Sequence, residues 1–126
     1  MKFLLTIVLC IFISNSYAGD GHSLKESCVE AEKLWSGKLG DKEKGMYCIG
    51  LLKGIVSVMT ITANSSNKET ANHLGMCNSA KPQHFISTEQ SITTVLKFLY
   101  TNPDKLEQQD FVIALKAMKK DYPCTK

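Results

Sequence analysis

The sequence predicts an all-α fold, a compact bundle of about four helices stapled by two disulfides. Apolar residues recur at helical spacing along four segments, and no segment alternates apolar and polar residues as a half-buried strand would. Residues that cap helices (Ser, Asp or Asn) stand near the start of each segment. Four cysteines follow the N-terminal apolar stretch, and an even number in a short exported chain indicates disulfide pairing.

The first eighteen residues are predicted to be a secretory signal peptide. Lys2 precedes the apolar run FLLTIVLCIFI, and the polar run SNSYA leads to cleavage after Ala18. The apolar run is too short to cross a bilayer. Cys10 is expected to leave with the signal, because the bulky Leu9 before it is unsuited to lipid attachment. Residues 19–126 then form a single helical domain with no membrane anchor.

The first helix of this domain is expected over residues 23–36. Ser23 and Glu26 have the spacing of a capping box, and Gly37 and Gly40 end the helix. Four residues share its expected buried face: Leu24, Cys28, Ala31 and Trp35.

The second helix is expected from the cap Asp41 to about Thr62, and it is the most hydrophobic part of the mature chain. Its broad apolar face comprises Cys48, Leu51, Leu52, Ile55, Val58, Met59 and Thr62. Glycine costs about 1 kcal/mol relative to alanine inside a helix. Gly50 and Gly54, one turn apart, therefore predict close packing of another helix, either within the monomer or across a dimer.

Residues 64–86 are predicted to be a long polar loop, with a short helical turn over 68–74. A loop of this length in a compact domain is usually either functional or disordered. Cys77 fixes the loop to the rest of the domain, which favours a functional role.

Two further helices are expected after this loop. Ser87 and Gln90 form a second capping box, and that helix stops near Thr101. Pro103 is expected to be the first residue of the last helix, with Asn102 as its cap. The predicted buried stripe of the last helix is Phe111, Ala114, Leu115 and Met118, with Leu106 near the start.

The loop between the first two helices predicts how the cysteines pair. If those helices run antiparallel, Cys28 and Cys48 lie at almost the same height on facing helices. We therefore expect a Cys28–Cys48 disulfide, which leaves Cys77–Cys124 to tie the loop to the C-terminus.

The composition argues against several classes of function. All fifteen basic residues are scattered lysines, and nucleic-acid sites favour arginine. His22, His73 and His84 lack the i, i+4 partner of a helical metal site, and no nucleophile motif is present. We expect no enzyme activity, no metal, no cofactor and no nucleic-acid partner.

Three stretches together resemble one family. They are YCIGLLKG at 47–54, the loop cysteine Cys77, and VLKFLYTNPDKLEQQDFVIALKAMKKDYPC at 95–124. Their order resembles the immunity proteins of type VI secretion amidase effectors, the Tai/Rap immunity family, and the resemblance covers nearly all of the mature chain. Family members often carry a proline soon after the loop cysteine, whereas here Asn78 follows Cys77.

The resemblance implies a periplasmic, all-helical homodimer that plugs the active-site groove of a peptidoglycan amidase. Such an effector resembles papain-like cysteine peptidases. In this chain the long loop is the natural plug, and its expected effector contacts are Asn78, Ser79, Lys81, Gln83 and His84. The alternative functions are a small helical ligand carrier and a periplasmic chaperone.

Overall fold

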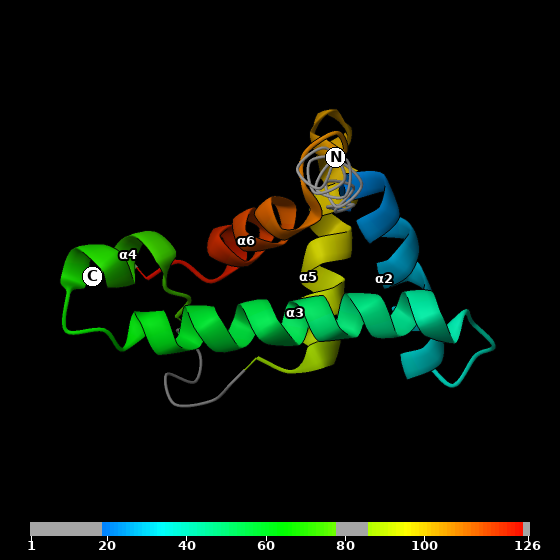
Figure 1. The fold of residues 1–126 in the computed structure, drawn as a ribbon, viewed down its shortest axis with the longest axis horizontal. Coiled ribbons are helices and arrows are strands. Elements are labelled where there is room, and N and C mark those ends of the chain that lie inside the picture. Colours follow the sequence, from blue (N-terminus) through cyan, green and yellow to red (C-terminus); the bar gives the residue numbers. More distant parts are fainter. Residues whose placement is uncertain (1–18, 78–85, 125–126) are drawn as a thin grey trace, which may run out of the picture.

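A computed structural model describes residues 19–77 and 86–124, and these residues form five α-helices and one 3₁₀ turn (Figure 1). The elements are α2 (Gly21–Trp35), α3 (Lys42–Ala63), α4 (Lys68–Leu74), α5 (Thr88–Thr101), η1 (Pro103–Lys105) and α6 (Asp110–Asp121). No strand occurs in the described ranges beyond an isolated bridge between Asp20 and Gln109. The all-α prediction is confirmed. The helix count is five rather than about four, because the turn expected over 68–74 is a full helix capped by Asn67.

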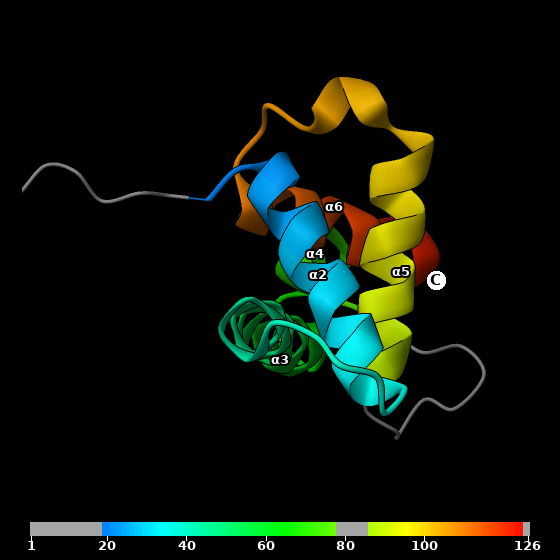
Figure 2. The ribbon, with the colours of Figure 1, turned by 90° about the vertical axis from the view of Figure 1, so that its right-hand side faces the viewer.

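Helix α3 lies across the other long helices. In Figure 1 it runs horizontally in front of α2 and α5, and Figure 2 shows it end-on at one side of them. Helices α2 and α5 run side by side in opposite directions in both views, and they pack against each other. The expected antiparallel pairing of α2 with α3 is therefore wrong, since α3 crosses α2 steeply and α5 is the antiparallel neighbour of α2.

The core forms where α3 crosses the other helices. Each of α2, α3, α5 and α6 contributes fully buried apolar side chains, in keeping with one hydrophobic core for one domain. The largest of them are Leu24, Leu52, Met59, Ile92, Leu99, Ile113 and Met118.

The α2–α3 crossing is fixed by a disulfide and a glycine. Cys28 and Cys48 are fully buried and bonded, with an S–S distance of 2.09 Å and a Cα–Cα distance of 5.1 Å. A Cβ at Gly45 would lie 2.5 Å from Leu34 Cδ1 and 3.3 Å from the Ala31 Cα atom. Gly45 is thus the residue that lets α3 approach the backbone of α2.

The helix starts follow the side-chain caps. Asp41 accepts a hydrogen bond from Lys44 N, and Ser87 forms the expected capping box with Gln90. The expected Ser23 cap is wrong: α2 begins at Gly21, and the Asp20 carboxylate accepts bonds of 2.9 Å from both the backbone N and the hydroxyl of Ser23. Asp20 offers a carboxylate one turn earlier and so moves the start of the helix.

The last helix is shorter than expected. Pro103 opens only the 3₁₀ turn η1, and α6 begins at Asp110. The chain between them is extended at Gln109, because it pairs with Asp20, and Gly21 N donates to Leu106 O at 2.8 Å. The buried residues of α6 are Asp110, Ile113, Ala114, Ala117 and Met118, whereas Phe111 is 44% exposed and Leu115 is only partly buried. Trp35, expected in the core, is 52% exposed.

Candidate functional site

The five expected effector contacts lie outside the described residues. These are Asn78, Ser79, Lys81, Gln83 and His84, in the segment 78–85. The structure does describe the two points where this segment joins the domain, and both are firmly held.

The first attachment point is Cys77. It forms a disulfide with Cys124, with an S–S distance of 1.95 Å, and its backbone N donates to Tyr122 O at 3.1 Å. One residue earlier, the buried Met76 donates from its backbone N to Met59 O at 3.2 Å. The Lys119 ammonium donates to the carbonyls of Asn72 and Gly75 at the end of α4. The segment 78–85 therefore begins next to a residue that contacts from α3 and α6 hold in place.

The second attachment point is Ile86 and Ser87. Ile86 is buried in the core, and Ser87 caps α5, with its hydroxyl accepting from Gln90 N at 3.2 Å. Both ends of the segment are thus tied to core helices. Fixed ends reduce the conformational entropy that a loop loses on binding.

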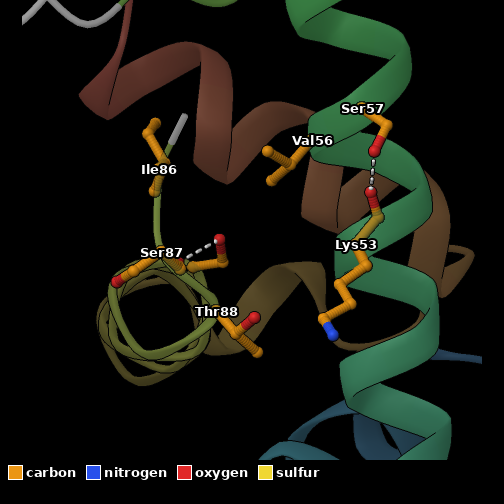
Figure 3. A pocket seen from close by; sticks show the side chains of 7 residues that line it. Lys53, Val56, Ser57, Ile86, Ser87 and Thr88 are labelled. Carbon is orange, nitrogen blue, oxygen red and sulfur yellow. Dashed lines mark hydrogen bonds between the residues drawn. The ribbon is translucent and has the colours of Figure 1, made fainter. Parts of the chain in front are cut away.

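A pocket of about 310 Å³ adjoins this second attachment point (Figure 3). Its described lining comes from α3 and the start of α5: Lys53, Val56, Ser57, Ile86, Ser87, Thr88 and Ser91. Ser57 Oγ donates to Lys53 O at 2.8 Å and Ser91 Oγ to Ser87 O at 2.9 Å, so both hydroxyl oxygens can still accept a bond. The Lys53 ammonium and the hydroxyls around it could hydrogen-bond a carboxylate or amide side chain of a partner.

A second surface is the outer side of α3, which we call the α3 face. It consists of Met46, Tyr47, Gly50, Gly54, Val58 and Ile61, all exposed. Val58 was expected in the core but is 63% exposed, and Ile61 is 72% exposed. In Figures 1 and 2, no other described helix lies over the middle of this side of α3, and only Tyr47 at its edge reaches α6, through Asp110.

The glycines in the middle of the α3 face have open space where a side chain would lie. A Cβ at Gly50 or Gly54 would have no described atom within 4 Å. The helix that these glycines would accommodate is therefore not another described helix of the same monomer. Lys53 is the one charged residue between Gly45 and Asn67, so the α3 face has little charge to keep it solvated.

By length and composition α3 could also cross a membrane, with a mean hydropathy of 1.6 over 18 residues. Its inner side, however, carries Cys48, Leu52, Val56 and Met59 of the core. A core helix with one uncovered apolar side accounts for the same composition.

The other polar contacts of interest hold parts of the domain together. The Tyr47 hydroxyl donates to the buried Asp110 carboxylate, and this hydrogen bond raises the pKa of Tyr47 to about 12. His22 pairs with Glu107 at 3.2 Å on the surface. Within the described ranges, no group of three His, Cys, Asp or Glu side chains could hold a metal ion.

The sequence did not identify Met46, Tyr47 and Ile61 as surface residues of interest. Apolar residues lie on all sides of α3, so helical periodicity alone could not tell its inner side from its outer side. The sequence feature that could have indicated an exposed apolar side is the near absence of charged residues along the helix.

Comparison with known proteins identifies the family. The profile of the Rap1a immunity proteins matches residues 20–124, almost the whole predicted mature domain. No curated protein and no solved structure matches the chain. The chain therefore belongs to the Rap1a immunity protein family, and it is an immunity protein against a type VI secretion effector.

Proposed function

We propose that this protein is exported to the periplasm, where it inhibits a peptidoglycan amidase effector by plugging the groove that holds the catalytic cysteine. The family match over residues 20–124 is the observation that carries the proposal. Two disulfides support export, because such bonds persist in oxidising compartments. Inhibition would protect the producing cell and its kin from effector injected by a neighbouring cell.

The proposed plug is the segment 78–85. Its neighbours Cys77 and Ile86 are fixed by a disulfide and by burial in the core, respectively. An inhibitory loop held at both ends inserts into a groove with a smaller entropic loss than a free peptide. The proposed contacts are Asn78, Ser79, Lys81, Gln83 and His84, whose side chains offer hydrogen-bond donors and acceptors to the polar walls of such a groove.

Replacing residues 78–84 with a Gly/Ser linker of equal length tests the plug. We expect loss of amidase inhibition with little change in melting temperature, because Cys77, Ile86 and their contacts remain. The matched control is the same replacement of residues 36–39, which join α2 to α3 and are all exposed. Nanomolar inhibition by the first variant would refute the plug.

We further propose that the protein is a homodimer and that the α3 face forms its interface. Bulky side chains (Met46 near one end, Val58 and Ile61 near the other) flank the glycines at the centre. Two such helices can cross at their glycines, so that the bulky ends of each pack beside the other in a self-complementary, two-fold contact. A second copy also suits a surface that offers a partner almost no charge.

A further inference from the structure

Asp110 is an unusual residue for the interior of this domain. It is 4% exposed at the start of α6. One carboxylate oxygen accepts the Tyr47 hydroxyl bond, and the other accepts a 2.6 Å bond from Phe111 N. The five ion pairs among the described residues all use other carboxylates. A buried carboxylate with only neutral donors has a desolvation cost that a nearby cation would offset.

Gly19 lies against this carboxylate. Its carbonyl accepts a bond from Asp110 N at 2.9 Å, and a Cβ at Gly19 would lie 2.5 Å from Asp110 Oδ2 and 3.1 Å from the Tyr47 hydroxyl. Backbone N and Cβ are about 2.5 Å apart within one residue, so Gly19 N lies at most about 5 Å from that oxygen. There is no room for a side chain here, but a rotation at Gly19 can bring its nitrogen to the carboxylate.

The chain beside Gly19 is held in place. Asp20 bridges to Gln109, and Gly21 N donates to the carbonyls of Leu106 and Gln108 at 2.8 and 3.0 Å. These contacts fix the start of the domain at the start of α6, so the position of Gly19 beside Asp110 does not depend on the residues that precede it.

We propose that removal of the signal peptide creates the missing cation. A signal peptidase adds water across the Ala18–Gly19 peptide bond, leaving a carboxylate on Ala18 and an amine on Gly19, which is protonated at neutral pH. The Gly19 α-ammonium then pairs with Asp110, whose other partners are the Tyr47 hydroxyl and Phe111 N. Processing thereby stabilises the folded domain, and the uncleaved chain lacks this ion pair. The inference rests on the proposed export.

The pair also predicts a pH dependence. An α-amino group ordinarily has a pKa of about 7.7–8.0, and a neighbouring carboxylate raises it. The stabilisation is then fully present below about pH 8 and is lost as the pH rises through the higher folded-state pKa. The titratable groups on the packed elements are Asp110 from α6, Tyr47 from α3, Asp20, and the surface pair His22 and Glu107.

The test begins with the mass of the intact protein purified from the periplasm. A chain that begins at Gly19 supports the proposal, and any other first residue overturns it. Two chains are then compared, one that begins at Gly19 and one with a single extra alanine before it. At pH 7 we expect the added alanine to lower the melting temperature by about 5 °C. The difference should vanish at high pH and in an Asp110→Asn background, and equal melting temperatures at pH 7 would overturn the pair.

An independent measurement covers the case in which Asp110→Asn does not fold. NMR titration of ¹⁵N-labelled Gly19 in the processed protein should give an α-amino pKa above its ordinary range, and a value within that range overturns the proposal. The Tyr47→Phe variant keeps the carboxylate and should keep the raised value. Amidase inhibition is measured separately, so a failed ion pair with intact inhibition leaves the proposed function standing.

Discussion

The two sides of α3 differ in what they contact, although they are made from similar residues. The inner side buries Cys48, Leu52, Val56 and Met59 against α2, α5 and α6. The outer side presents Met46, Val58 and Ile61, which are 60%, 63% and 72% exposed. Apolar composition alone therefore did not decide which residues became core. The crossing with α2, fixed by Cys48 and Gly45, decided it.

The glycines of α3 show the same contrast. Gly45 is needed inside the domain, because a Cβ there would press on Leu34 and approach the α2 backbone. Gly50 and Gly54 have open space around them, so nothing in the described monomer accounts for their cost to the helix. A close approach by a second molecule is the use we propose for them.

Removing the disulfide on the inner side of α3 should give the largest loss of stability. The Cys28→Ala/Cys48→Ala variant loses a buried crosslink between residues 20 apart, and the expected loss in the free energy of unfolding is about 3 kcal/mol. Chemical denaturation measures it. The matched comparison is the oxidised wild type, which keeps both disulfides, and a variant as stable as this protein would contradict a role for the Cys28–Cys48 bond at the crossing.

A leucine at Gly45 should give the next largest effect. The new side chain must fit between α2 and α3, and such overpacking costs about 1–3 kcal/mol. Thermal unfolding at neutral pH measures the loss. Unchanged stability would mean that α3 does not approach α2 as closely as the structure indicates.

The same substitution at Gly54 should act in the opposite direction on the monomer. Leucine has space there and a better helix propensity, so we expect a gain of about 0.5–1 kcal/mol in the monomer. The added side chain should also separate the proposed dimer. Light scattering after gel filtration measures the mass. A wild-type monomer, or a Gly54→Leu dimer, would contradict the α3 face as the interface.

A further expected effect concerns Tyr47, at the edge of the α3 face. Removing its hydroxyl in Tyr47→Phe should cost about 1.5–3 kcal/mol, the typical value of a hydrogen bond to a charged group. Because the pKa of Tyr47 is raised to about 12 in the folded protein, its contribution is present below pH 10 and falls as the pH rises toward 12. Alkaline absorbance titration should show a late-ionising tyrosine in wild type that is lost in Tyr47→Phe.

Local sequence signals predicted much of the fold. The Asp41 and Ser87 caps and the short helix after Asn67 each depend on a few neighbouring residues. Both expected disulfides are present, although the antiparallel packing from which the Cys28–Cys48 pair was predicted is wrong. The start of α6 at Asp110 could not be predicted locally, because it follows the pairing of Asp20 with Gln109, a contact between distant parts of the chain. The start of α2 follows a local cap instead, the Asp20 carboxylate on Ser23.

The candidate site was predictable to a lesser degree. The loop that carries Cys77 was proposed as the site from its length, polarity and cysteine, and this role stays a prediction. The outer side of α3 was not, since Val58 and Met59 are adjacent apolar residues and only the tertiary crossing exposes the first and buries the second. The five proposed contacts in the segment 78–85 remain predictions.

The most direct test is titration of the proposed partner, a peptidoglycan amidase effector, with the mature protein, with peptidoglycan cleavage as the readout. We predict that cleavage falls in proportion to added protein and stops near one domain per enzyme. The variant with residues 78–84 replaced should leave cleavage unchanged at the same concentrations. Full cleavage in the presence of excess wild-type protein would contradict the proposed function.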